Sequence, residues 1–301
     1  MKKEKTEYFV YAAMFIFFII MLIIGTFHDY PIAKTLYSEH NVIATMITTL
    51  GVYPFFTGAV FFLGALSGRV SALNISKVIR IPLCVLFILV AGFVGFIGAG
   101  AIVDVDCLGG IFPVLNKNIP VIIALSIIVE YPLCILGVRL ARRSDENKLL
   151  KKIIIMIIFL LVTYISMTMI KDIFGRPRFR SVAVGYEGVD FVPWYTPFTK
   201  VAEMKEKYGL ASSEFRSFPS GHGVFVVTTV YILLSLSWFF KKLQTKRGLL
   251  LGIGFSYAVI IMFTRMVLGA HYLSDVSAGG IIGMIFLLAF TFIMRRLEKQ
   301  T

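Results

Sequence analysis

Residues 153–170 read IIIMIIFLLVTYISMTMI, an apolar run that contains no charged side chain. A run of this kind suits a transmembrane helix, because about 20 predominantly apolar residues cross the hydrocarbon core of a bilayer. Across all 301 residues, hydrophobic side chains make up 58% and charged side chains only 16%. Ordinary soluble chains contain about 45–50% apolar and about 25% charged residues. The composition therefore excludes a soluble globular fold and a disordered chain, and it predicts an integral membrane protein.

The same apolar pattern recurs along the chain. It predicts an all-α fold, a polytopic membrane bundle of about eight transmembrane helices. The first span follows three lysines, as in a signal peptide, but its apolar run is too long and no cleavage site follows, so we expect it to remain as an anchor. The expected spans are Tyr8–Phe27, Met46–Leu66, Ile79–Val103, Ile119–Leu140, Ile153–Ile170, Gly221–Phe240, Leu249–Leu268 and Val276–Met294.

The net charge of +13 would indicate nucleic-acid binding in a soluble protein. In a membrane protein, basic residues gather in cytoplasmic loops, which accounts for the excess without a nucleic-acid partner. With a cytoplasmic N-terminus, most of the 30 Lys and Arg residues fall in inner loops, and most of the others fall in one outer loop, 171–219. We therefore expect a multi-pass protein of the cell membrane with both termini in the cytoplasm. The cysteines, Cys84, Cys107 and Cys134, are too widely spaced for a disulfide framework or a metal motif.

The outer loop 171–219 is the only long hydrophilic segment of the sequence, and long ordered loops usually carry function. It begins with four cations, Lys171, Arg176, Arg178 and Arg180. Cations at a helix end are typical of an interfacial anchor, but the positive-inside rule disfavours them on the outer face unless they bind something. Because Lys and Arg hold phosphate oxygens, this first cluster indicates an anion site.

The second cluster, PSGH at residues 219–222, stands where the outer loop enters the sixth span. Unpaired backbone N–H groups and the positive end of the helix dipole make a helix start suitable for an anion. His222 taken alone is typical of a helix cap or an interfacial residue. Its position after Ser220 and Gly221 would instead place it beside a bound phosphate.

The third cluster lies between the last two spans and contains Arg265, His271 and Asp275. On a helix, the i,i+4 spacing puts His271 and Asp275 on one face, where the carboxylate can hold the imidazole N–H. We expect a break near Gly269, because a continuous helix would turn Arg265 away from His271. Ionisable residues in an otherwise apolar stretch indicate function. Topology places all three clusters on one side of the membrane, where together they suit a phosphoryl group.

The three clusters resemble the signature of the type-2 phosphatidic acid phosphatase (PAP2) superfamily, which is KxxxxxxRP, PSGH and SRxxxxxHxxxD. The chain departs from it at Phe179, where the family has Pro, and at Thr264, where the family has Ser. Arg176-Pro177 is a literal Arg-Pro pair, but it lies too close to Lys171, so we prefer the register through Arg178. The matching positions are Lys171, Arg178, Pro219, Ser220, Gly221, His222, Arg265, His271 and Asp275.

The resemblance implies the all-helical core shared with vanadium haloperoxidases, and hydrolysis of a phosphomonoester or diphosphate through a phosphohistidine without a metal or cofactor. It implies that His271 is the nucleophile, that Asp275 holds it, and that His222 is the general acid and base. It covers residues 153–301, including the outer loop, whereas residues 1–152 are expected to form about four helices, two of them additional to the family core. The implied phosphate-binding residues are Lys171, Arg178, Ser220, Gly221 and Arg265.

We expect a lipid phosphate in the bilayer as the substrate, attacked at the extracytoplasmic face. The candidate substrates are polyprenyl diphosphate, phosphatidic acid and phosphatidylglycerophosphate, and the sequence does not decide between them. It does not decide the oligomeric state either. Phe191, Trp194 and Tyr195 are expected to line the entrance to the site. The alternatives are a vanadium-dependent oxidase with the same pocket, a non-catalytic lipid-binding relative, and a transporter. A transporter would place ionisable residues deep in several spans, whereas only Glu130 clearly lies mid-span.

Overall fold

The computed structural model describes residues 2–299, except for the side chains of residues 2–6 and 172. Over this range the fold is helical and contains no β-strand. The helices are α1 (Lys2–Leu36), α2 (Val42–Thr49), α3 (Tyr53–Ser71), α4 (Lys77–Ile102), α5 (Leu108–Ile111), α6 (Ile119–Leu125), α7 (Tyr131–Arg143), α8 (Leu149–Phe174), α9 (Phe179–Val184), α10 (Val201–Tyr208), α11 (Gly221–Ser235), α12 (Arg247–Val267) and α13 (Leu273–Lys299). A π-helical turn, Ser126–Glu130, joins α6 to α7, and short 3-10 turns occupy Pro113–Leu115, Ser212–Phe215, Leu236–Trp238 and Lys241–Lys246.

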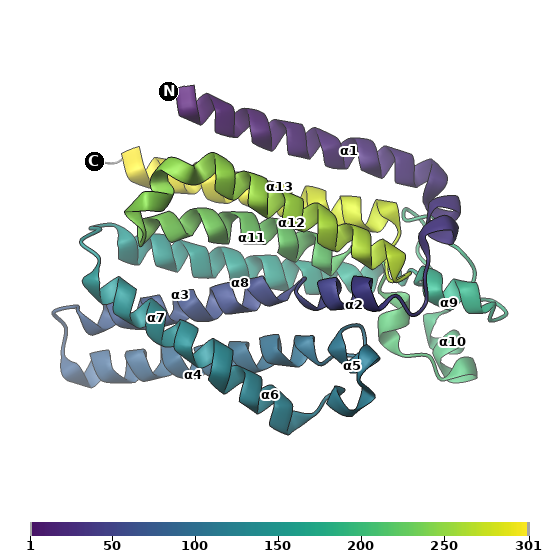
Figure 1. The fold of residues 1–301 in the computed structure, drawn as a ribbon, viewed down its shortest axis with the longest axis horizontal. Coiled ribbons are helices and arrows are strands. Elements are labelled where there is room, and N and C mark those ends of the chain that lie inside the picture. Colours follow the sequence, from purple (N-terminus) through teal and green to yellow (C-terminus); the bar gives the residue numbers. More distant parts are fainter. Residues whose placement is uncertain (1, 300–301) are drawn as a thin grey trace. The chain divides into compact units, whose positions relative to one another are not determined.

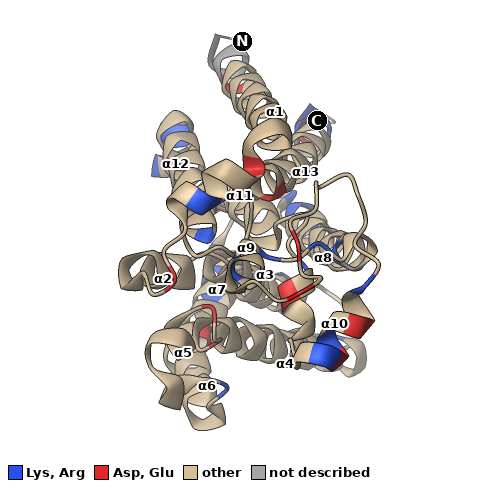
Figure 2. Cartoon of the chain, turned by 90° about the vertical axis from the view of Figure 1, so that its right-hand side faces the viewer, with Lys and Arg blue, Asp and Glu red and all other residues tan. Residues whose placement is uncertain are grey.

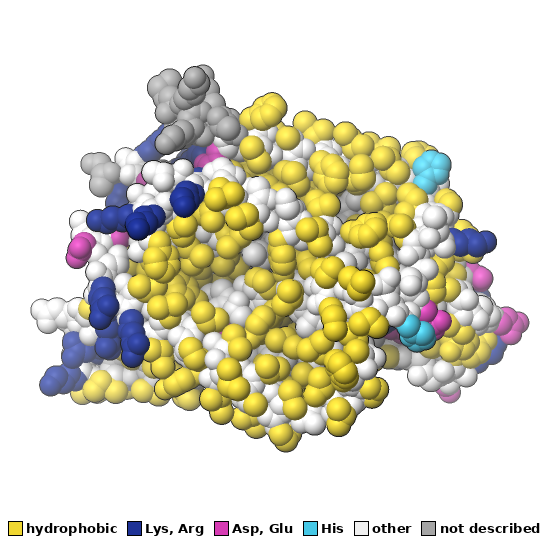
Figure 3. Space-filling view, viewed as in Figure 1, with side chains coloured by type: hydrophobic (Ala, Val, Ile, Leu, Met, Phe, Trp, Pro, Cys, Tyr) yellow, Lys and Arg dark blue, Asp and Glu magenta, His cyan; other side chains and the backbone are white. Residues whose placement is uncertain are grey.

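Eight helical segments in the described range are long and apolar enough to cross a membrane, as predicted. The long helices carry few charged residues (Figure 2), and the visible face in Figure 3 is mostly hydrophobic. The observed bounds differ by a few residues from the predicted ones in most spans, and the first, second and fourth spans differ further. Helix α1 continues past Phe27 and therefore contains Asp29. The second and fourth spans are each divided, and α3 and α7 begin with the pairs Tyr53-Pro54 and Tyr131-Pro132, because Pro is well suited to the first turn of a helix.

The chain forms two compact units, each assembled from separate segments. Helix α1 groups with the segments that carry the three polar clusters, and the domain boundary expected at residue 152 stays a prediction. The first unit contains Met1–Thr48, Thr163–Val227 and Ile253–Leu288, and the second contains Thr49–Val162, Thr228–Gly252 and Ala289–Thr301.

In the second unit, α3 packs against both α4 and α7 (Figure 1). Glycines allow the backbones of α3 and α7 to approach closely. A Cβ added at Gly64 would lie 2.2 Å from the carbonyl oxygen of Cys134, and one added at Gly137 would lie 2.2 Å from that of Phe61. Small residues at helix contacts are typical of membrane bundles, where van der Waals packing holds the helices together.

In the first unit, the C-terminal ends of α1 and α12 lie beside each other, and so do the N-terminal ends of α11 and α13. The Ser38 N–H donates to the carbonyl oxygen of Val267 (2.9 Å), joining the chain just after α1 to the end of α12. The Ser220 N–H donates to the carbonyl oxygen of Asp275 (3.0 Å), joining the start of α11 to the first turn of α13. The second and third polar clusters of the sequence therefore lie together at one end of this unit.

Candidate functional site

Helices α8 and α11 bring the first two clusters together. Lys171 lies in the last turn of α8, and a Cβ added at Gly221 would lie 3.2 Å from its Nζ. Ser220 precedes α11, and its Oγ accepts a hydrogen bond from the Gly223 N–H (3.2 Å). His222 lies in the same turn and is partly exposed. Because a helix start presents N–H groups and a positive dipole end, Lys171 adds a full charge to a place already suited to an anion.

The predicted break between α12 and α13 is confirmed. Gly269 has a φ of +60°, which glycine adopts readily and other residues rarely, and α13 begins only at Leu273. His271 lies in this connection and is fully buried. Its Nδ1 is 2.7 Å from the carbonyl oxygen of Ser217 and 3.8 Å from Oδ2 of Asp275. Because a carbonyl oxygen only accepts, this contact assigns the proton to Nδ1 and the lone pair to Nε2.

The Nε2 atom of His271 is buried and has no hydrogen-bond partner among the described residues. Burial, above all, lowers the pKa of His271 to about 3; Lys171, Arg265 and Arg178 lower it further, and Asp275 acts against them. The imidazole is therefore neutral at physiological pH, with an unprotonated nitrogen in strongly positive surroundings. A neutral imidazole of this kind serves as a nucleophile or a base, and the cations suit an anionic substrate.

Asp275 makes shorter contacts with other groups than with His271. Its Oδ2 accepts hydrogen bonds from the Ser217 hydroxyl (2.6 Å) and from the Tyr272 backbone N–H (2.8 Å). Its Oδ1 accepts one from Nη1 of Arg176 (2.5 Å). Ser217, which the sequence analysis did not single out, therefore links Asp275 to His271 through its hydroxyl and its carbonyl oxygen.

Arg176, which the sequence analysis set aside in choosing the register, is fully buried at the centre of the site. Its Nη2 donates to Oδ2 of Asp29 on α1 (2.9 Å), its Nη1 also donates to Oγ of Ser274 (2.9 Å), and its Nε donates to the carbonyl oxygen of Val192 (2.8 Å). Asp29 in turn accepts from the backbone N–H of Ser274 (2.9 Å) and from its hydroxyl. Two features of the sequence could have indicated this network. One is an acidic residue near the end of an apolar span, and the other is the literal Arg-Pro pair.

Glu214 fixes the first basic cluster to the end of the outer loop. Its carboxylate accepts hydrogen bonds from Arg180 (2.9 Å from Nε) and from the Ser181 hydroxyl (2.7 Å), and it lies 3.9 Å from Nη1 of Arg178. Its partial burial opposes the negative charge, but Arg180 and Arg178 outweigh this effect and lower the pKa of Glu214. The carboxylate therefore stays ionised and holds Arg178 close to the site.

Phe179, which replaces the family Pro, is buried at the first position of α9. Its ring packs edge to face on Tyr37, Tyr30 and Tyr272, with centroids 5.4, 5.9 and 6.0 Å away. The preceding residue, Arg178, has φ −72° and ψ 149°, the conformation preferred before proline. The backbone thus retains the geometry of an Arg-Pro pair, while the aromatic ring adds packing against α1.

The aromatic residues of the outer loop differ in their surroundings. Trp194 stacks on Phe218, with centroids 5.2 Å apart, and its Nε1 donates to the Thr26 hydroxyl on α1 (3.0 Å). Phe191 packs against Tyr272, beside the third cluster. Tyr195 is exposed. Trp194 and Phe191 therefore lie against residues next to the PSGH and His271 segments.

The region that contains the three clusters also matches a known family. A model of the PAP2 superfamily matches residues 152–299. The chain is similar to the curated protein "Probable lipid phosphate phosphatase 4" from Arabidopsis thaliana, with 28% identity over 194 residues, or 60% of this chain. The match also spans 60% of the relative's own length. No solved structure matches the chain.

Proposed function

We propose that the chain is a membrane phosphatase that hydrolyses a lipid phosphate or diphosphate through a phosphohistidine, because a model of the PAP2 superfamily matches residues 152–299. The observation that carries the proposal is the state of His271. Its Nε2 is buried without a hydrogen-bond partner in the described structure, and its Nδ1 is held by a carbonyl oxygen. The lone pair of Nε2 is therefore available to attack phosphorus.

In the proposed first step, Nε2 of His271 bonds to phosphorus and the bond from phosphorus to the lipid oxygen breaks. His222 donates a proton to the leaving oxygen, and it later takes a proton from the water that hydrolyses the phosphohistidine. The imidazole becomes positively charged when it is phosphorylated. The Ser217 carbonyl, at 2.7 Å, and the Asp275 carboxylate, at 3.8 Å, would stabilise that charge.

The cations would bind the phosphoryl oxygens. Lys171, Arg178 and Arg265 all act electrostatically on His271, and Ser220 and Gly221 supply the start of α11. Electrostatic stabilisation of this kind is usually the largest part of catalysis, and removal of one donor typically lowers turnover by about 10²–10³.

The lipid part of the substrate is a further proposal. The relative's name supports a lipid phosphate, and polyprenyl diphosphate, phosphatidic acid and phosphatidylglycerophosphate are the classes we favour. We place the site at the extracytoplasmic interface and both termini in the cytoplasm, because that orientation agrees with the distribution of Lys and Arg in the loops.

The test is phosphate release by the purified chain in detergent with EDTA, from a panel of prenyl diphosphates and glycerolipid phosphates. We expect release by the wild-type chain, none by His271→Ala, and wild-type release by His40→Ala, which removes an exposed histidine outside the site. Loss of wild-type activity in EDTA would refute metal independence. No release from any lipid by folded protein would favour a non-catalytic or transport role.

A further inference from the structure

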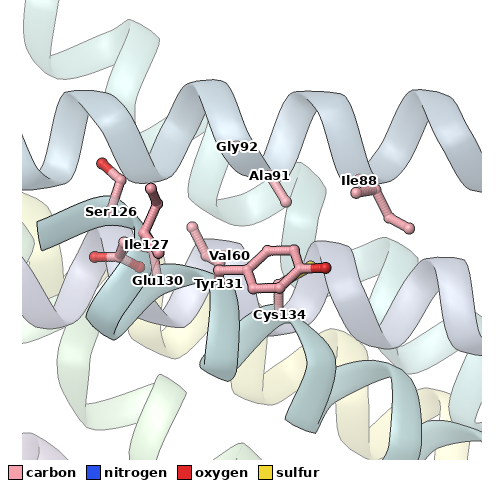
Figure 4. A pocket seen from close by; sticks show the side chains of 9 residues that line it. All are labelled: Val60, Ile88, Ala91, Gly92, Ser126, Ile127, Glu130, Tyr131 and Cys134. Carbon is pink, nitrogen blue, oxygen red and sulfur yellow. The ribbon is translucent and has the colours of Figure 1, made fainter. Parts of the chain in front are cut away.

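The second unit contains a cavity of about 320 Å³ between α3, α4, α7 and the π-helical turn that precedes α7 (Figure 4). Its volume lies at the lower end of the range for small-molecule sites, about 300–1,000 Å³. Its walls are mostly apolar and include Val60, Ile88 and Ala91. The cavity lies outside the catalytic cluster, all of whose residues belong to the first unit.

Among the described residues that line this cavity, Glu130 is the only acidic one. It is 2% exposed, and neither of its carboxyl oxygens makes a hydrogen bond of normal geometry among the described residues. The Tyr53 hydroxyl lies close enough to act on Glu130 as one hydrogen-bond donor. The Ser126 hydroxyl, also in the lining, already donates to the carbonyl oxygen of Ile122 (2.8 Å). Because a buried carboxyl group with a single weak donor is costly, this one can accept from a further partner outside the chain.

The backbone on both sides of Glu130 leaves space for its side chain. Glu130 is the last residue of the π-helical turn Ser126–Glu130, and such turns inside α-helices occur frequently at functional sites. Opposite it on α4, a Cβ added at Gly95 would lie 2.9 Å from Cβ of Glu130. The absence of a side chain at Gly95 therefore leaves room for the carboxyl group between the two helices.

The cavity is bordered by exposed apolar side chains on membrane-spanning helices. Ile88, Ile127 and Tyr131 line it and are 41%, 61% and 59% exposed, on segments that are apolar enough to cross the bilayer. A ligand would therefore enter from the lipid and carry a hydrocarbon chain. In such a low-dielectric setting a carboxylate favours a positively charged partner and disfavours an anionic one.

We propose that this cavity binds an amphiphile with one hydrocarbon chain and a protonated amine. The chain occupies the apolar walls, and the ammonium group donates hydrogen bonds to Glu130. The site is independent of the proposed phosphatase reaction.

The test is equilibrium binding of radiolabelled dodecylamine to the purified full chain in detergent micelles, with dodecanol and dodecanoate as competitors. We expect one saturable site that prefers the amine. Glu130→Gln keeps the size of the side chain but removes the charge, and it should weaken amine binding about tenfold or more, as expected for a lost charge-assisted hydrogen bond. Glu206→Gln, which removes an exposed carboxylate on α10, should bind like the wild type.

A second pair of variants tests the cavity itself. A Cβ added at Gly92, which lines the cavity, or at Gly252 on α12, meets no atom within 4 Å. Gly92→Leu should therefore fill the cavity and weaken binding of both the amine and the alcohol, whereas Gly252→Leu should not. Unchanged amine affinity in Glu130→Gln, or equal binding of dodecanoate, overturns the proposal. If Glu130→Gln does not fold, unchanged amine binding in Gly92→Leu overturns it instead.

Discussion

Asp29→Asn tests whether α1 supports the proposed active site in the first unit. With the amide oxygen of Asn in the place of Oδ1, the hydrogen bond from the Ser274 N–H is kept. The NH2 group of the amide then takes the place of Oδ2. That group is a donor facing the donors of Arg176, 2.9 Å away, and of the Ser274 hydroxyl. One charge-assisted hydrogen bond contributes about 1.5–3 kcal/mol, and breaking a buried ion pair costs about 3–5 kcal/mol. Because Arg176 keeps Asp275 as a partner, we expect a loss near the lower limit, about 3 kcal/mol.

Activity should fall as well, because Ser274 immediately precedes Asp275 and Asp29 fixes it by two hydrogen bonds. A misplacement of about 1 Å in a catalytic group can lower the rate about 10²-fold, so we expect kcat to fall about 10- to 100-fold with a smaller change in KM. Stability would be measured by denaturant unfolding in detergent, followed by tryptophan fluorescence, and kcat by phosphate release. Asp190→Asn, an exposed carboxylate in the outer loop, is the matched control. Wild-type stability and kcat in Asp29→Asn would refute the role given to α1.

Three further predictions concern the outer loop and the histidine. Phe179→Pro should lower the free energy of unfolding no more than Phe179→Ala does, because the backbone already suits proline and only the ring packing is lost. For both variants we expect a loss of up to about 3–5 kcal/mol in unfolding experiments. A much larger loss in Phe179→Pro would contradict the view that the backbone suits proline. The pKa of His271 in the folded chain, about 3, lies below the ordinary value of 6.5. The neutral imidazole should therefore contribute fully to the free energy of unfolding above pH 6.5, and this contribution should decline as the pH falls toward 3. His271→Gln should remove that part of the pH dependence, and an unchanged pH profile in this variant would argue against a buried neutral imidazole. Trp194→Ala should change the preference among lipids more than it changes hydrolysis of a small soluble phosphate ester, and equal losses on both substrates would count against a role in lipid selection.

The fold could be predicted from the sequence because each span carries its own signal. The length and apolar composition of a run such as 153–170 predict a transmembrane helix without information from any other segment. The Gly269 break was also predictable, since only a break brings Arg265 and His271 to the same side. The helix bounds were harder to predict. Helix α1 continues past Phe27 through Asp29, whose charge lowers the local hydropathy but is paired with Arg176.

The site was predictable where its chemistry lies in side chains at fixed local spacing, as in PSGH and in His271 with Asp275. The Ser217 carbonyl could not be predicted, because a backbone oxygen has no residue signature. The pairing of Asp29 with Arg176 joins positions 147 residues apart, and no local periodicity encodes such a contact. Only the tertiary packing of α1 against the start of α13 makes it visible.

Rapid quenching shows directly whether His271 becomes phosphorylated at Nε2 during turnover. The chain would be mixed with a lipid substrate labelled with ³²P in the scissile phosphate, stopped in base, where phosphohistidine survives, and digested for peptide mapping. We predict a transient label on His271, absent from His271→Gln and retained longer in His222→Ala, which lacks the base for the second step. Turnover by the wild-type chain with no label, or with the label on another residue, would contradict it.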